Sequence, residues 1–560
     1  MSASVVPPAA ALILGAVILA LARGRLRDAT MLLAPLLALG LVWQTPDGAW
    51  GVSGFLGYDL ILVRGDRLSR WFGTVFALMA FASGLFALNQ KSRLEVCATQ
   101  LYAGAALGVV FAGDLISTFV FWEVMALAST ALIWSAGPAA RAAGFRYLAM
   151  HLFGGVLLLI GIAAEVQAAG HAAFNSMTLD TPARWLILAG FLINAGAPPL
   201  SAWLPDAYPQ SSVSGMVTLS AFTTKTAVFV LLRGFPGAEI LIWVGLFMVM
   251  YGIVYAILEN DMRRILAYSI VNQVGFMVTG IGIGTELALN GAAAHAFAHI
   301  IYKALLLMSA GSVLYMTGRS KCTDLGGLFR SMPLTTACGI VGALAISAFP
   351  LTSGFVTKSM ISEAAGAQGL AVVWFLLAAG SAGVFLHAGI KFPWFVFFQK
   401  DSGLRPRDPP WNMRAAMLLF AFLCLLFGVA PGLLYAHLPF RAAFTPYTGD
   451  HLVSQLQLLL FSGLAFFLLL GVLQRTRTLT LDTDWFYRGL GRTAWLAAIE
   501  RTKVGWNIGA GLVARRVDLA LDVLSRVARD GIFARAQASG TMAMLAVMSL
   551  AVYLLIELLH

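Results

Sequence analysis

Long apolar stretches separated by short polar loops run along almost the whole chain. Sixteen windows are apolar over about the 20 residues that a helix needs to cross a membrane. The windows lie at 8–22, 29–45, 68–90, 93–112, 115–135, 145–168, 184–203, 213–233, 239–258, 264–284, 287–317, 335–362, 368–399, 412–436, 452–474 and 541–559. This pattern predicts an all-α, polytopic membrane protein built as one bundle. The first window lacks the basic region and cleavage pattern of a signal peptide, so we interpret it as a span.

Two of the predicted spans are interrupted by proline. The seventh, FLINAGAPPLSAW, contains Pro198 and Pro199, and the twelfth is LAISAFPLTSGFVTKSMI. Broken backbone at membrane depth is tolerated where protein or water covers the freed carbonyls, and paired broken helices are typical of transport sites. Each broken span is followed by a span with an apolar-flanked lysine, Lys225 or Lys391. We interpret this as two copies of one transport unit.

Three lysines lie within apolar spans. Lys225 is flanked by apolar residues on both sides, Lys358 follows the twelfth-span break, and Lys391 precedes Pro393. A lysine at the centre of a spanning helix costs about 2.5–3.5 kcal/mol on insertion scales, so such residues usually serve ion movement. The alternative is a lysine that snorkels to the interface. For Lys225, Arg233 already marks the end of the helix, which favours a functional role.

The fifth span carries an acidic residue, Glu123, among aromatic and aliphatic neighbours. A nearby ammonium such as Lys225 would favour its ionised form, and removal of that charge would favour the protonated form, so the carboxylate could load and release a proton. The alternative is a static ion pair that locks two helices together. Asp114, at the start of the span, is predicted to be an N-cap. His151 is a secondary candidate, with an ordinary buried histidine as the alternative.

His295, His299 and Lys303 recur at every fourth residue of the eleventh span. They are predicted to form one stripe along a helix, with steps of about 6 Å. Histidine titrates near neutrality and can relay protons through water. A zinc site and a polar packing stripe are the alternatives, although the HxxxH pattern lacks the glutamate of HExxH.

The composition agrees with a membrane protein and argues against bound cofactors. Hydrophobic residues make up 59% of the chain and charged residues 11%. The four cysteines have no CxxC spacing. No nucleotide-binding motif is present, since the glycine-rich stretch GIGIGTE at 280–286 is predicted to be a turn at the end of a span. We therefore expect no metal, haem, iron–sulfur or nucleotide cofactor.

The net charge of +11 is unevenly distributed between the loops. Lysine and arginine gather in the loops after odd-numbered spans, which predicts that these loops are cytoplasmic and that both termini are outside. Arg64, Arg67 and Arg70, around the loop after the second span, are the exception.

The segment at 481–539 differs from the spans, since it mixes many arginines with apolar residues such as Trp495 and Leu519. It is predicted to be an amphipathic helix along the cytoplasmic membrane surface, packed on lipid or a neighbouring subunit. The alternative is a solvated cytoplasmic helix. A terminal span at 541–559 follows.

Four phrases are specific enough to indicate a family: FWEVMALAS, PPLSAWLPDAYPQS, ENDMRRILAYSIVNQVGF and AAHAFAHIIYKALLLMSAGSVLY. They resemble the proton-translocating membrane subunits of respiratory complex I and of multisubunit Mrp-type Na⁺/H⁺ antiporters, most of all the D-type subunit of these antiporters. The resemblance covers about residues 95–400. The segment after it resembles, in shorter form, the tail of the complex I subunit that carries a lateral helix.

The resemblance implies about fourteen core helices with two inverted five-helix repeats, each a half-channel, joined by a hydrated axis. It implies that the proton path runs through residues of both repeats. Their positions are Glu123, Lys225, His295, His299, Lys303 and Lys358, to which we add Lys391. The family usually has a lysine in the seventh helix where this chain has Asn194. A neutral amide cannot replace that charge. Either Lys225 becomes the partner of Glu123, or the input half of the path works differently, or the subunit no longer pumps, and we favour the first.

From these residues we expect six regions. They are N-terminal helices (1–92), a first antiporter-like repeat (93–233), a second (239–400), C-terminal helices (412–474), the amphipathic segment (481–539) and a terminal helix (541–559). The expected function is proton translocation in a multisubunit Na⁺/H⁺ antiporter of the bacterial inner membrane, without redox cofactors of its own. Its expected partners are other membrane subunits, protons, Na⁺ and lipid, with no nucleic acid. The alternatives are a proton-pumping subunit of an NADH:quinone oxidoreductase- or hydrogenase-type complex and a non-pumping assembly scaffold.

Overall fold

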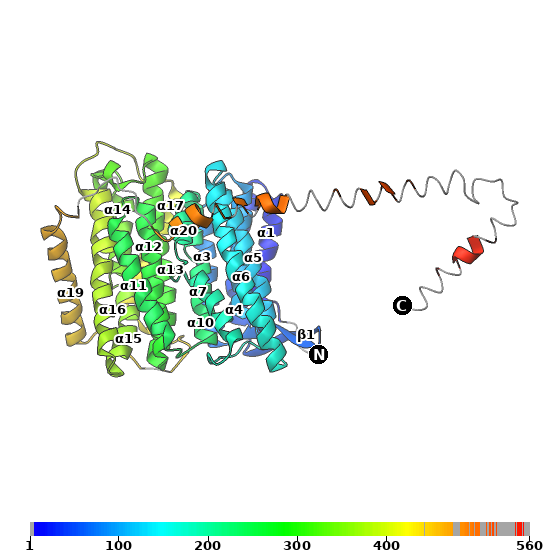
Figure 1. The fold of residues 1–560 in the computed structure, drawn as a ribbon. Coiled ribbons are helices and arrows are strands. Elements are labelled where there is room, and N and C mark those ends of the chain that lie inside the picture. The colour runs from blue at the N-terminus through cyan, green and yellow to red at the C-terminus, as the bar shows by residue number, and fades with distance from the viewer. Residues whose placement is uncertain are drawn as a thin grey trace. The chain divides into compact units, whose positions relative to one another are not determined.

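The computed structural model of the protein describes residues 5–441, 443–473 and 482–491, together with scattered positions between 493 and 553. The chain forms two units, residues 1–484 and 485–560. The helices of the first unit stand side by side as one bundle, with α19 (Gly449–Leu468) at its edge (Figure 1). This arrangement confirms the predicted all-α membrane fold.

Fifteen predicted spans, up to residue 474, correspond to helices of the bundle. Among the described residues, twelve helical stretches are long and apolar enough to cross a membrane, and three shorter apolar helices accompany them. The helices of the first seven spans are α1 (Pro8–Leu21), α2 (Gly24–Gln44), α3 (Arg67–Phe86), α4 (Arg93–Phe111), α5 (Leu115–Trp134), α6 (Arg141–Ala169) and α7 (Pro182–Ala195) with α8 (Trp203–Ala207). Those of spans eight to eleven are α9 (Val213–Leu219) with α10 (Thr223–Gly234), α11 (Ile240–Leu258), α12 (Met262–Ile283) and α13 (Glu286–Thr317).

The remaining described spans complete the bundle. They are α14 (Pro333–Ile346) with α15 (Ser353–Ala367), α16 (Ala371–Val384) with the π-helical segments η5 (Phe385–Lys391) and η6 (Trp394–Phe398), α17 (Trp411–Val429) with α18 (Gly432–Tyr435), and α19. The amphipathic segment predicted at 481–539 and the span predicted at 541–559 lie mostly outside the described residues. Within them, α20 (Asp484–Phe486) and η7 (Tyr487–Gly491) are described.

Helix breaks or distortions occur in the seventh, eighth, twelfth and thirteenth spans. The last three of these carry Lys225, Lys358 and Lys391, and the seventh precedes the span with Lys225. The seventh span is interrupted between Ala195 and Trp203, and the twelfth between Ile346 and Ser353, as predicted. In the twelfth span Ala348 and Leu351 adopt φ values of 56° and 68° on either side of Pro350. The eighth span is also broken, at Ser220–Phe222, and the thirteenth turns π-helical at its lysine. These two distortions were not predicted.

Local signals explain several boundaries. Asp114 caps α5 as predicted, because its side chain accepts a hydrogen bond of 2.7 Å from the amide of Ser117. The turn expected at GIGIGTE is confined to Gly284 and Thr285: α12 continues to Ile283, Gly284 caps it with φ 76°, and Thr285 caps α13.

A β-hairpin between α2 and α3 is absent from the sequence predictions. Strands β1 (Gly48–Phe55) and β2 (Tyr58–Gly65) are antiparallel, with Phe55 opposite Tyr58 and Gly48 opposite Gly65. The two-residue turn holds Leu56 at φ 49° and Gly57 at φ 83°, the positive pair of a type I′ turn. Leucine is unusual at such a position, so the sequence lacks the Asn-Gly or Asp-Gly signal of a hairpin.

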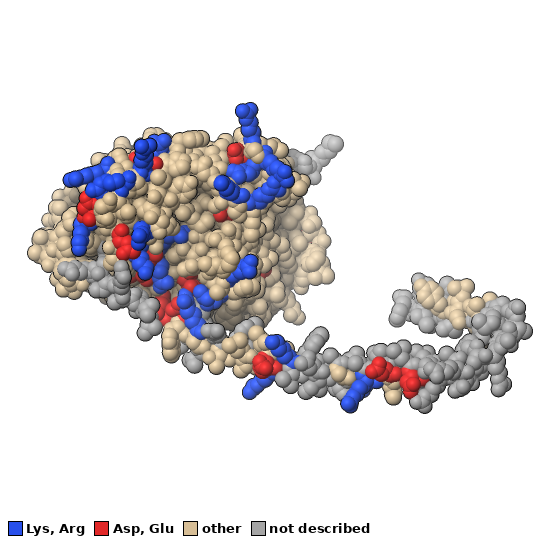
Figure 2. Space-filling view, turned by 90° about the horizontal axis from the view of Figure 1, so that it is seen from above, with Lys and Arg blue, Asp and Glu red and all other residues tan. Residues whose placement is uncertain are grey.

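The hairpin lies at the lower end of the bundle in Figure 1, near the beginning of the chain. The opposite end faces the viewer in Figure 2, where several groups of lysine and arginine side chains are interleaved with acidic residues. This distribution is what the positive-inside pattern of the loops predicts for one end of the bundle.

Candidate functional site

Lys225 lies directly after the break in the eighth span. Its side chain is fully buried, and Nζ donates hydrogen bonds to the carbonyl of Ser220 at 2.6 Å and to Thr224 Oγ1 at 3.0 Å. The break between α9 and α10 leaves the Ser220 carbonyl free to accept this bond. The ammonium therefore occupies the helix interruption itself, deep in the bundle and away from the ends of the span.

The predicted stripe of α13 faces Lys225. His295, His299 and Lys303 are all fully buried, and each lies close enough to interact electrostatically with the Lys225 ammonium. Lys303 Nζ donates to Ser269 Oγ of α12 at 2.7 Å. The centroids of the two histidine rings are 6.2 Å apart. The structure thus brings an α10 lysine and the three α13 residues into one buried cluster.

Polar residues that the sequence analysis did not single out surround His295. Its Nε2 lies 3.1 Å from Gln273 Oε1, and its Nδ1 lies 3.3 Å from Thr357 Oγ1 of α15. Tyr302 Oη donates to the same Gln273 oxygen at 3.0 Å. These contacts connect α12, α13 and α15. In the described residues no group of three His, Cys, Asp or Glu side chains is arranged to hold a metal ion.

Lys358 continues the cluster from the twelfth-span break. Its Nζ has no hydrogen-bond partner among the described residues, lies 4.2 Å from the centre of the Phe276 ring, and interacts electrostatically with His295. The lysine also lines a cavity of about 560 Å³ between α15, α16 and α19. Glu363, Asp450 and His451 line the same cavity. Lys358 is therefore the residue where the buried cluster meets a polar cavity.

Glu123 lies apart from this cluster, in the first repeat. Its Oε1 is buried without a hydrogen-bond partner, and among the residues that the structure describes it forms no ion pair. A Cβ atom built at Gly155 of α6 would lie 2.2 Å from this oxygen. A larger residue at position 155 would therefore force the Glu123 carboxylate to move. The pairing of Glu123 with Lys225 stays a prediction, since the structure holds the two in no direct contact.

The departure from the family pattern, Asn194, has a partner of its own. Its Oδ1 lies 2.8 Å from Nδ1 of His151, and both side chains are buried. The His151 ring packs between Tyr147, with centroids 4.1 Å apart, and Trp203 at 4.6 Å. His151 precedes Gly155 by one turn of α6, so this pair lies next to the Glu123 carboxylate along the helix. At the position where the resemblance implies a lysine, this chain has a neutral amide bonded to an imidazole.

Lys391 occupies a different kind of position. Its Nζ donates to the carbonyls of Ala256 at 3.1 Å, of Glu259 at 2.7 Å and of Ile257. These carbonyls end α11, so the ammonium satisfies orphan acceptors at the negative end of a helix dipole. His387, one turn earlier, interacts electrostatically with both Lys303 and Lys391. Lys391 is thus attached to the cluster through a histidine that the sequence analysis did not select.

The signals for the missed residues were present but weak. His387 stands in HAGIKFPWF, four residues before a lysine that was selected, and Gln273 stands in a phrase used for the family resemblance. Spacing along one helix could not show that Gln273 meets His295 and Tyr302, because those contacts join separate helices.

Relatives of known sequence support the resemblance. The family described as NADH:quinone oxidoreductase/Mrp antiporter, TM, matches residues 112–386. The N-type subunit of NADH-quinone oxidoreductase from Desulforudis audaxviator is 31% identical over 61% of this chain and 73% of its own. The D-type subunit of the Na⁺/H⁺ antiporter from Alkalihalophilus pseudofirmus is 30% identical over 58% of this chain and 68% of its own. The chain spans 66% of the length of a Mycobacterium tuberculosis relative, which is 31% identical.

Two solved structures share the fold. A chain of the Mrp complex from Dietzia sp. DQ12-45-1b superposes with a TM-score of 0.68 over 77% of this chain and 95% of that chain, at 23% identity. A chain of the membrane-bound sulfane sulfur reductase, an archaeal respiratory membrane complex, superposes with a TM-score of 0.72. The match covers 98% of this chain and 99% of that chain, at 24% identity. The fold, the buried lysine and histidine cluster and the aligned relatives agree: this chain belongs to the family of NADH:quinone oxidoreductase and Mrp antiporter transmembrane subunits, the ion-translocating membrane subunits of antiporter and respiratory complexes.

Proposed function

We propose that this chain is a proton-translocating membrane subunit of a multisubunit monovalent-cation/proton antiporter, with Na⁺ as the expected cation. The observation that carries the proposal is the buried cluster of Lys225, His295, His299, Lys303 and Lys358, which lies between two broken helices in a family of ion-translocating subunits. Buried ammonium and imidazole groups without carboxylate partners are costly in a membrane, so a fold retains them where they have a function.

In this proposal protons enter the first repeat near Glu123 and cross to the second through Lys225. The His295, His299 and Lys303 stripe then passes them to Lys358. Several polar atoms along this route are buried without a partner among the described residues, namely Glu123 Oε1, His151 Nε2, Asn194 Nδ2, both ring nitrogens of His299 and Lys358 Nζ. Buried polar groups normally have hydrogen-bonding partners, and ordered water is the partner that a proton relay uses.

The cavity beside Lys358 supplies the other end of the route. Its lining residues Glu363 and Asp450 are exposed and acidic, and His451 can take up a proton. His451 Nδ1 lies 2.7 Å from the carbonyl of Pro446, which can only accept, so in the neutral ring Nδ1 carries the hydrogen and Nε2 is left to accept a proton. We propose that protons leave the buried cluster through this cavity.

The six regions expected from the sequence remain part of the proposal. The distortions of the eighth and thirteenth spans support two copies of one unit, because each follows a broken span and each lies beside a lysine. The amphipathic segment would then attach the bundle to lipid or to a neighbouring subunit. Like the position of both termini outside the cell, this assignment rests on the sequence.

A proton-pumping subunit of a redox-driven complex is the second candidate function. The 31% identity to an N-type subunit of a quinone oxidoreductase supports it. In that case the same cluster would move protons, while electron carriers would belong to other chains. A non-pumping scaffold is the third candidate, supported by the neutral Asn194–His151 pair.

Proton flux in inverted vesicles from cells that carry the native gene cluster separates these candidates. A pH-sensitive dye would follow the flux after addition of Na⁺, K⁺ or Li⁺ and, separately, after addition of NADH or another reductant. Flux triggered by a cation alone supports the antiporter. Flux that needs a reductant would contradict it in favour of a redox-driven pump, and a silent chain under both conditions would favour the scaffold.

A further inference from the structure

The arginines that break the positive-inside pattern gather around one pocket. Arg64 and Arg67 line a pocket of about 790 Å³, and Arg233, from the end of α10, lines it as well. Arg70 lies beside it and pairs with Asp47 at 2.6 Å. We refer to Arg64, Arg67, Arg70 and Arg233 as the arginine cluster. The route proposed for protons does not use it.

The walls of the pocket come from both repeats and from the hairpin. Arg64 belongs to β2, Asn175 and Ser176 to the loop after α6, Leu289 to α13 and Phe440 to the loop before α19. Each of these segments lies at the end of the bundle that the loop charges assign to the outside. The pocket is therefore at a membrane surface.

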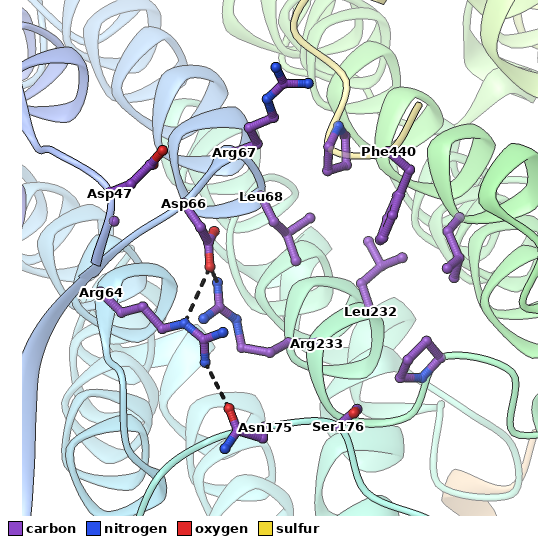
Figure 3. Close-up of a pocket in the computed structure, with 14 residues that line it drawn as sticks. Asp47, Arg64, Asp66, Arg67, Leu68, Asn175, Ser176, Leu232, Arg233 and Phe440 are labelled. Carbon is purple, nitrogen blue, oxygen red and sulfur yellow. Dashed lines mark hydrogen bonds and ion pairs between the residues drawn. The ribbon is translucent and has the colours of Figure 1, made fainter. Parts of the chain in front are cut away.

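Two carboxylates only partly balance the cluster. Asp66 lies between Arg233, at 2.7 Å, and Arg64, at 3.4 Å (Figure 3). Burial alone would raise the pKa of Asp66, but Arg233, Ser69 and Arg64 together hold this pKa below its ordinary value, so Asp66 is ionised. Asp47 forms an ion pair with Arg70. Four guanidinium groups thus face two carboxylates, which leaves the pocket with an excess of positive charge.

Arg233 has hydrogen-bond donors that the described part of the protein does not use. Its side chain is only 4% exposed, and one nitrogen, Nη2, donates to Asp66 while the guanidinium lies 4.9 Å from the centre of the Phe229 ring. Nε and Nη1 are buried without a partner among the described residues. A buried guanidinium with unused donors is costly, and the oxygen atoms of a bound anion would accept hydrogen bonds from them.

We propose that this pocket binds a phosphate group, with Arg233 as the buried contact and Arg64 and Arg67 as its outer contacts. Arginine matches phosphate geometry through paired hydrogen bonds. Part of the lining is apolar, from Leu68, Leu232, Leu289 and Phe440, which suits the headgroup and glycerol region of an anionic phospholipid better than a free ion. Inorganic phosphate would bind the same arginines as a phospholipid headgroup. The experiment therefore tests the phospholipid and free phosphate separately.

The test uses the full chain in the membrane assembly with which it purifies. The sample is reconstituted into nanodiscs of phosphatidylcholine alone or with added phosphatidylglycerol, and native mass spectrometry measures the retained lipid. The Arg64→Gln/Arg67→Gln double variant removes the two partly exposed contacts. Arg441→Gln is the matched control, because Arg441 is exposed and adjoins the lining residue Phe440 without lining the pocket itself.

We expect the wild type and Arg441→Gln to retain phosphatidylglycerol in preference to phosphatidylcholine. In the double variant, the ratio of retained phosphatidylglycerol to phosphatidylcholine should be about tenfold lower. In the second arm, inorganic phosphate is added to the phosphatidylcholine sample and the melting temperature is measured. Stabilisation of the wild type by phosphate, with no lipid preference, would identify a free ion as the ligand. A wild type that shows neither effect would overturn the proposal, as would equal lipid retention by all three proteins.

A second measurement does not depend on whether the variants fold. A cryo-EM map of the wild type in phosphatidylglycerol nanodiscs should show a density peak within hydrogen-bond distance of Arg233 Nε or Nη1. An empty pocket in a map that resolves the neighbouring Asp66 side chain would contradict the proposal.

Discussion

The two proposed repeats, 93–233 and 239–400, have similar backbone breaks but different chemistry around them. In the second, Lys303, His295 and Lys358 lie within electrostatic reach of one another or of Lys225. In the first, Glu123 has no ion-pair partner in the described structure, and Asn194 is bonded to His151. A helix break supplies free backbone groups and space, whereas the side chains decide which charges occupy them.

The largest effect in the second repeat is expected from Lys358→Met. Methionine fills a similar volume but cannot carry a proton, so cation-driven proton flux should fall by at least about a hundredfold, the lower end of what a positioned proton-transfer group contributes. Dye-monitored flux in inverted vesicles would measure it. Lys400→Met, at an exposed lysine outside the cluster, is the control and should keep wild-type flux. Equal flux in both variants would remove Lys358 from the route.

Glu123→Gln should reduce flux by about a hundredfold, because the amide cannot be ionised and the first repeat has no second carboxylate beside it in the described structure. Asn194→Lys would restore the charge usual in the family next to His151. If the repeats differ only by this charge, the lysine should keep or raise flux in the wild-type background and should not restore the flux lost in Glu123→Gln. Unchanged flux in Glu123→Gln would indicate that the first repeat does not conduct.

The fit of Glu123 against α6 can be tested with Gly155→Ala. The added methyl group would lie against Glu123 Oε1, so the carboxylate must move, at a cost of about 1–3 kcal/mol for overpacking. We expect flux to fall less than in Glu123→Gln, together with a lower melting temperature. At the neighbouring Gly154 a Cβ would lie 3.2 Å from an Ile193 methyl group, so Gly154→Ala tests packing without touching the carboxylate. Equal flux losses in the two alanine variants would assign the effect to packing alone.

The smallest effect on flux is expected from Lys391→Met. This lysine binds the carbonyls that end α11, so its loss should destabilise the protein by about 1 kcal/mol and leave flux within about twofold of the wild type. Thermal unfolding and vesicle flux, measured on the same preparation, separate the two roles. A flux loss as large as that of Lys358→Met would place Lys391 in the proton path, as its sequence position predicts.

The sequence was sufficient for the features that depend on local pattern. Apolar length predicted the spans, proline predicted the breaks in the seventh and twelfth, and helical spacing predicted the stripe of His295, His299 and Lys303. Each of these signals lies within one segment, so the sequence carries it directly.

Features that join distant segments could not be predicted. The Asn194–His151 contact and the meeting of Gln273 with His295 depend on how the helices pack. The break at Ser220–Phe222 has no proline, and it is accompanied instead by the Lys225 ammonium, which binds a freed carbonyl. The hairpin was missed because its turn places Leu56 where asparagine or glycine is usual.

If Lys225 connects the two proposed repeats, its removal should stop flux, whereas removal of a comparable buried lysine should not. Lys225 and Lys391 are both buried, and both donate to backbone carbonyls beside a helix distortion, but only Lys225 faces the α13 stripe. The measurement is Na⁺-triggered proton flux in inverted vesicles with Lys225→Ala beside Lys391→Ala, at equal assembly of the complex. We expect flux to be lost in Lys225→Ala and kept in Lys391→Ala. Wild-type flux in Lys225→Ala would contradict it.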